Sequence, residues 1–205
     1  MLSFEQIILG IPALLLAISV HEFAHGYAAY RLGDPTAKHH GRLTLNPLAH
    51  LDPIGALMLL IFRFGWARPV PVNSAYFKDR KKGTLIVSVA GPLSNILMAW
   101  LFFNLVRILP NRMPTFALAQ TVYHFLLLNL NYNLGLAAFN LLPLPPLDGS
   151  KIAASLLPPR WEYNYLRLSQ YGPFILMLLL WTGVAQIVLR PISQTLLRMI
   201  SFLSI

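Results

Sequence analysis

Residues 4–30 read FEQIILGIPALLLAISVHEFAHGYAAY, an apolar run that passes directly into a motif rich in ionisable side chains. A helix needs about 20 residues to cross a hydrocarbon core of about 30 Å, so this stretch is long enough to span a membrane. Residues 4–20 have no basic leading segment and no small-residue cleavage site. We therefore expect them to remain in the mature protein and not to be removed as a signal peptide.

The rest of the chain has the same apolar character. Of 205 residues, 56% are hydrophobic and 11% are charged, which is typical of a membrane protein. Further apolar segments of spanning length lie at residues 84–109, 115–142 and 172–189. Residues 54–64 (IGALMLLIFRF) are too few for an easy crossing and contain Arg63, so we interpret them as re-entrant or interfacial. No polar linker divides the chain, which predicts one domain over residues 1–205.

Two segments between the first and second spans are expected to be extended. Residues 38–47 (KHHGRLTLNP) and 68–73 (RPVPVN) contain proline and alternate polar with apolar side chains. They could pair as a small β element at the membrane surface. The predicted fold class is therefore an all-α polytopic membrane protein with about four transmembrane helices, a re-entrant or interfacial segment and this β element.

The basic residues predict the orientation of the chain. If the four spans alternate, twelve Lys or Arg fall on the face that also receives HEFAH, residues 90–95 (AGPLSN) and Asp148, and four fall on the other face. Basic residues are retained on the cytoplasmic side. This predicts an integral, multi-pass protein of the cell membrane with its polar site toward the cytoplasm. The net charge of +9 is spread over these gaps, which favours contact with the lipid bilayer and not with nucleic acid.

HEFAH predicts a metal site. His21 and His25 are four residues apart, so both lie on one face of a helix and can bind one Zn²⁺. Glu22 lies beside them and is placed to act as a general base on water activated by the metal. The alternative is a chance match, but three ionisable residues at the end of an apolar helix usually mark function. The chain has no cysteine, so further ligands must be His, Asp or Glu.

Asp148 is the candidate for the third ligand. It follows the helix-breaking stretch PLPP at residues 143–146, and the alternation of spans brings it to the face that holds the histidines. Its structural alternative is to cap a helix that starts near Ser150. Asp34 and Asp52 each precede a proline and are interpreted as turn residues.

Asparagines in the spans need partners, and hydrogen bonds between helices account for most of those in residues 115–142. Asn95 is expected to face the interior of the protein. Asn140 lies about two turns before Asp148 and could bond the backbone of a substrate opened for cleavage.

Three motifs in order, HEFAH, AGPLSN and NLLPLPPLDG (residues 140–149), resemble those of the site-2 protease family of intramembrane zinc metalloproteases. The resemblance covers residues 20–151 and implies one zinc ion held by His21, His25 and Asp148, with Glu22 as the catalytic base. It also implies that Asn95 and Asn140 contact the substrate, which would add as an extended strand to the small sheet. Many members carry a PDZ or nucleotide-sensing domain, for which these 205 residues have no room.

The predicted function is hydrolysis of peptide bonds in or near the transmembrane segment of a membrane protein. One alternative is a metal-binding membrane protein without proteolysis, such as a transporter or a pseudoprotease. A carrier needs a polar path across the membrane, and residues 7–20 are almost wholly apolar. A second alternative, a purely structural subunit, leaves HEFAH and LDG unexplained.

Overall fold

The computed structural model describes residues 4–55, 58 and 66–204, and these residues are helical with connecting loops. The elements are α1 (Phe4–Arg31), α2 (Thr36–His39), α3 (Pro47–His50), η1 (Ser74–Tyr76), α5 (Arg80–Ile108), η2 (Pro110–Arg112), α6 (Phe116–Asn140), α7 (Asp148–Leu156), α8 (Pro159–Leu168), η3 (Ser169–Tyr171), α9 (Gly172–Trp181) and α10 (Val184–Phe202). Among the described residues there is no β-strand, so the predicted all-α class is confirmed.

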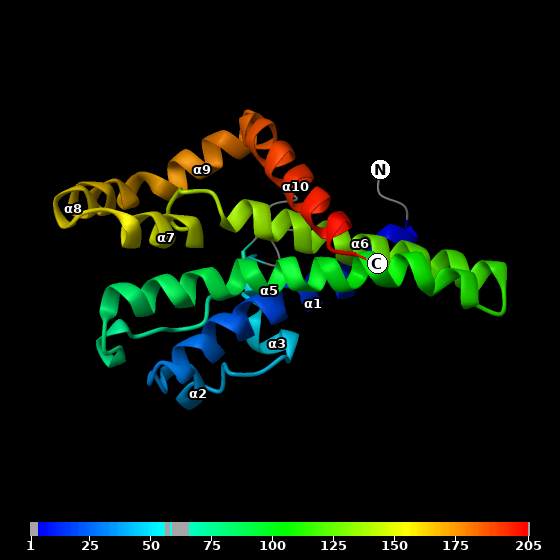
Figure 1. Ribbon diagram of the computed structural model, residues 1–205, viewed down its shortest axis with the longest axis horizontal. Coiled ribbons are helices and arrows are strands. Elements are labelled where there is room, and N and C mark those ends of the chain that lie inside the picture. Colours follow the sequence, from blue (N-terminus) through cyan, green and yellow to red (C-terminus); the bar gives the residue numbers. More distant parts are fainter. Residues whose placement is uncertain (1–3, 56–57, 59–65, 205) are drawn as a thin grey trace.

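Three long helices form the body of the protein. α5 and α6 run side by side as an antiparallel pair joined by the short turn η2, and α1 packs against both of them (Figure 1). α10 crosses the α5–α6 pair, and its Leu196 and Ile200 join a core with Phe102, Leu130 and Leu134. This arrangement keeps the end of α1 that carries HEFAH beside the first half of α5.

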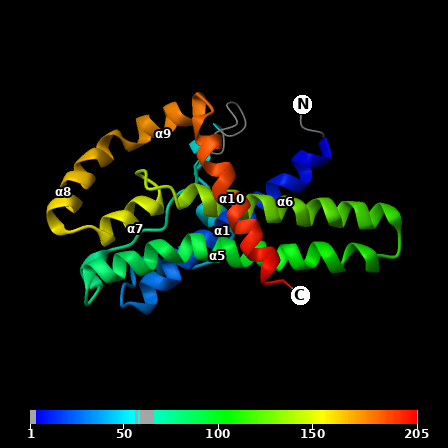
Figure 2. The same cartoon turned by 45° about the horizontal axis from the view of Figure 1, so that its top comes forward.

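Two described helices, at Ile8–Arg31 and Arg80–Ile108, are long and apolar enough to cross a membrane. A third crossing is possible if the bent pair of helices Arg160–Trp181 and Val184–Phe202 is one broken span. The predicted fourth helix, residues 172–189, is not continuous. Gly183 has a φ of 75° and lies at the break between α9 and α10 (Figure 2), where the segments Arg160–Trp181 and Val184–Phe202 are bent by 87°. Glycine allows this left-handed conformation because it has no Cβ.

The predicted β element is not found in the described residues. Residues 36–39 and 47–50 are short helices. The second of them, α3, begins here because Asn46 caps it through the amide of Leu48 and Pro47 occupies its first position. The only β-type pairing among the described residues is one isolated bridge, between Leu51 and Ala67. The two segments nevertheless meet, since the buried Arg42 guanidinium donates to the carbonyls of Arg68 and Pro69.

Most of the predicted re-entrant segment, residues 54–64, lies outside the described residues.

Candidate metal centre

α1 presents its two histidines to one point. His21 and His25 lie one turn apart, and their rings meet edge to face with centroids 4.6 Å apart. Their Nε2 atoms are 3.0 Å from each other. Both side chains are buried against α5, at the end of a helix long and apolar enough to cross a membrane. The spacing of the motif thus brings two imidazole nitrogens together, as predicted.

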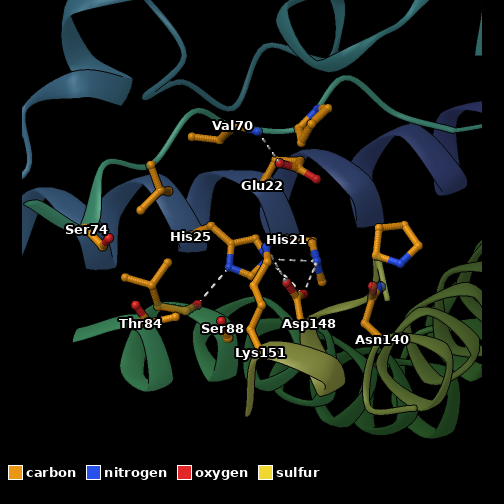
Figure 3. A pocket seen from close by; sticks show the side chains of 14 residues that line it. His21, Glu22, His25, Val70, Ser74, Thr84, Ser88, Asn140, Asp148 and Lys151 are labelled. Carbon is orange, nitrogen blue, oxygen red and sulfur yellow. Dashed lines mark hydrogen bonds and ion pairs between the residues drawn. The ribbon is translucent and has the colours of Figure 1, made fainter. Parts of the chain in front are cut away.

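Asp148 reaches the same point from the start of α7. Its Oδ2 lies 3.2 Å from Nε2 of His21 and 3.0 Å from Nε2 of His25 (Figure 3). The predicted alternative role as a helix cap is not seen, because Leu147 is the N-cap residue of α7 and Asp148 is already helical. The second carboxylate oxygen faces Lys151, whose Nζ is 3.8 Å away.

The hydrogen-bond partners of the two Nδ1 atoms determine whether the Nε2 atoms of His21 and His25 can bind a cation together with Oδ2 of Asp148. Nδ1 of His21 faces Oδ1 of Asn95 at 2.6 Å, and Nδ1 of His25 faces the main-chain carbonyl of Val87 at 2.7 Å. Both partners accept hydrogen bonds, so each Nδ1 carries the proton of a neutral ring and each Nε2 presents a lone pair.

Two lone pairs and a buried carboxylate oxygen therefore converge with no proton assigned between them. Oδ2 of Asp148 has no conventional hydrogen-bond partner within the described part of the chain. Such a set fits a cation, and His₂Asp with one further position for water is a zinc donor set.

Gly91 makes room for this cluster. A Cβ atom there would lie 2.7 Å from Cε1 of His21 and closer still to Nε2 of His25. Glycine inside a span is suited to a place where a neighbour approaches closely, and here the neighbours are the two imidazole rings.

Glu22 lies beside the three converging side chains. Its Oε2 accepts a 2.8 Å hydrogen bond from the main-chain amide of Val70 (Figure 3). This contact joins α1 to residues 69–72, which we call the strap. Asp34, fully buried just after α1, accepts a second amide bond at the end of the strap, from Asn73 at 2.7 Å. The turn role predicted for Asp34 is also present, because it accepts from the amide of Thr36.

A cavity of about 420 Å³ opens over the cluster. Its walls come from α1, the strap, the first half of α5, the end of α6 and the start of α7. The lining residues are His21, Glu22, His25, Pro69, Val70, Val72, Ser74, Thr84, Val87, Ser88, Asn140, Pro146, Asp148 and Lys151. An extended peptide entering this cavity would meet the three candidate ligands and Glu22 together.

The two predicted substrate residues lie in different places. Asn140 lines the cavity, with Nδ2 bonded to the carbonyl of Leu136 in its own helix, so it stays a candidate for substrate contact. Asn95 is fully buried behind His21, and its amide also donates to Ala17 and Asn133. It is not among the residues that line the cavity, so its contact with substrate stays a prediction, and its Oδ1 faces Nδ1 of His21.

Sequence reasoning missed the amide of Val70 and the side chain of Lys151. A main-chain donor has no residue-type signal, whereas Lys151 follows Asp148 by three residues on a helix and could have been found from that spacing.

Several known proteins are similar to this chain over most of its length. The family model described as Peptidase family M50 matches residues 114–180, which include Asn140 and Asp148. "Putative zinc metalloprotease YwhC" of Bacillus subtilis is 43% identical over 180 residues, covering 87% of this chain and 82% of that protein. "Putative zinc metalloprotease Rip2" of Mycolicibacterium smegmatis is 33% identical, covering 85% of this chain and 67% of that protein. "Putative zinc metalloprotease MJ0611" of Methanocaldococcus jannaschii is 32% identical over 101 residues, 48% of each chain.

No solved structure matches the chain. The similarity to the Bacillus protein covers most of both sequences and agrees with the donor set built by α1 and α7. The chain therefore belongs to peptidase family M50, the site-2 protease family, and is a zinc metalloprotease.

Proposed function

We propose that this protein hydrolyses peptide bonds in or near the transmembrane segment of a membrane-protein substrate. In this proposal His21, His25 and Asp148 hold one zinc ion and Glu22 is the catalytic base. The observation that carries the proposal is the convergence of three ligand atoms at 3.0–3.2 Å, two of which lie on a helix able to cross a membrane. A protease with its reacting groups on such a helix is suited to substrates in the bilayer.

Each group has a defined part in the reaction. When bound, zinc lowers the pKa of water at its open position and polarises the carbonyl that is attacked. Glu22 takes a proton from the attacking water while the water oxygen bonds to the carbonyl carbon. Glu22 then passes the proton to the amide nitrogen as the C–N bond breaks, which leaves a carboxylic acid and an amine, and the acid gives its own proton to the amine. The amide of Val70 holds one oxygen of Glu22, so the carboxylate keeps a fixed orientation.

The strap is the proposed docking edge for substrate. Val70 and Val72 line the cavity, and no main-chain hydrogen bond of Val72 occurs within the described residues. A substrate unwound from its helix has unpaired amides and carbonyls, which an extended partner can satisfy. Asn140 lies across the cavity and can bond the substrate backbone from the other side.

We further propose a single-domain, multi-pass topology in the cell membrane, with the site toward the cytoplasm. α6 has 25 residues and runs beside α5, so both would cross the bilayer together, and the α9–α10 pair would supply a fourth, broken crossing. The basic residues divide twelve to four in favour of the face that carries the site. The partners in this proposal are lipid and the substrate's helix, and nucleic acid is not among them.

A non-proteolytic metal-binding role is not favoured, because Glu22 lines the same cavity as the candidate ligands and the most similar relatives described above are named metalloproteases. The test uses protein reconstituted into vesicles with a single-span model substrate that carries helix-breaking residues. Mass spectrometry should locate a cut in or near the span, absent with Glu22→Gln. Cleavage confined to soluble peptides or distant loops would contradict the intramembrane part of the proposal.

A further inference from the structure

A chain of buried side-chain amides connects His21 to α6. Oδ1 of Asn95 lies 2.6 Å from Nδ1 of His21, and Nδ2 of Asn95 donates to Oδ1 of Asn133 at 2.8 Å. Nδ2 of Asn133 in turn donates to the main-chain carbonyl of Asn129 at 2.9 Å. Asn95 and Asn133 are fully buried, so these bonds do not compete with water.

Hydrogen bonds to main-chain carbonyls fix which way the side-chain amides of Asn95 and Asn133 are turned. The carbonyl of Asn129 can only accept, so the NH₂ group of Asn133 must face it and Oδ1 of Asn133 must face Asn95. The NH₂ group of Asn95 therefore faces Asn133 and also the carbonyl of Ala17 at 3.1 Å. Oδ1 of Asn95 is left facing His21, and His21 must carry its proton on Nδ1.

The two histidines differ in how this proton is fixed. His25 donates to the main-chain carbonyl of Val87, which no single substitution removes. His21 depends on the side chain of Asn95 in α5, whose NH₂ group is held by the side chain of Asn133 in α6 and by the main-chain carbonyl of Ala17. If the amide of Asn95 rotated by half a turn, its NH₂ group would face Nδ1 and drive the proton onto Nε2, the atom that must bind the metal.

We propose that Asn133 is a positioning residue for the metal centre, acting through Asn95 to fix the tautomer of His21. The inference rests on the proposed zinc ligation by His21 and is independent of whether the enzyme cuts within a membrane span. Partners of the distant nitrogen of a metal-bound histidine affect metal affinity by about 10–100-fold.

The test is the zinc affinity of the full-length protein in detergent, measured by competition with a chelator. Asn133→Leu should lower the affinity about tenfold or more. Asn129→Leu is the matched control, because Asn129 is equally buried one turn away and, among the described residues, its Nδ2 bonds only to the carbonyl of Phe125 in its own helix. Asn133→Ala, which cannot overpack the interface, carries the same expectation if the leucine variant does not fold.

A double-mutant cycle separates orientation from general packing. Asn95→Asp presents an acceptor to His21 whichever way its carboxylate turns, so it no longer needs Asn133 to orient it. In that background Asn133→Leu or Asn133→Ala should change zinc affinity little. Equal zinc affinity in the Asn133 and Asn129 variants would overturn the proposal, as would an equal loss with and without Asn95→Asp. Because the readout is zinc affinity, failure of the proteolysis proposal would leave this result interpretable.

Discussion

The main-chain amide of Val70 donates a 2.8 Å hydrogen bond to Oε2 of Glu22, which ties the proposed catalytic base to the strap. The strap lines the cavity in which substrate would lie. The same segment that would bind the substrate backbone therefore also orients the carboxylate that would act on it. This contact makes the position of the base sensitive to residues that hold the strap.

Glu22→Gln is expected to lose at least about 10²-fold in cleavage rate, because a glutamine amide cannot take the proton from water. The glutamine carbonyl can still accept from Val70, so the strap should keep its place. Zinc content and thermal stability serve as controls and should match those of the unmodified protein. A variant that cleaves at the normal rate would show that Glu22 is not the base.

Asp34→Ala is expected to raise KM while leaving zinc content unchanged. The substitution leaves the main-chain amides of Thr36 and Asn73 without their acceptor and releases the far end of the strap. Asp52→Ala is the matched control, since Asp52 likewise accepts two main-chain amides, from Ile54 and Gly55, but does not bond to the strap. Kinetics on a model substrate would separate the two variants, and identical KM values would argue against a role for the strap in substrate binding.

Gly91→Ala is expected to displace the imidazole rings and reduce bound zinc. The added methyl would lie 2.7 Å from Cε1 of His21, a distance that carbon atoms do not tolerate. Gly135→Ala is the matched control on α6, because a Cβ there meets nothing within 4 Å. Metal analysis of the two purified variants tests this, and full zinc occupancy in Gly91→Ala would mean that the rings can shift without losing the metal.

Most of the candidate centre could be predicted from sequence because it depends on strong periodic signals. Helical spacing places His21 and His25 on one face, and the alternation of spans places Asp148 near them. The family comparisons support the zinc chemistry that these residues suggested. The substrate role of Asn140 stays a prediction.

Two predicted elements, the small β element and a continuous fourth span, are not confirmed because local signals compete with the alternating and apolar patterns there. Asn46 followed by Pro47 is a helix-start signature, and it overrides the alternation that suggested a strand. Gly183 interrupts an apolar run that by hydropathy alone resembles one span. The partners of Asn95 depend on how α1, α5 and α6 pack, which no pattern within one helix reveals.

The central claim is that His21, His25 and Asp148 bind one zinc ion on which Glu22 acts. The most direct test is metal analysis of detergent-purified protein, comparing the unmodified chain, Glu22→Gln and Asp148→Ala after identical washing. The account predicts about one zinc per chain in the first two and little in Asp148→Ala, because two imidazoles alone make an incomplete site. Undiminished zinc in Asp148→Ala, or no zinc in the well-folded unmodified protein, would contradict it.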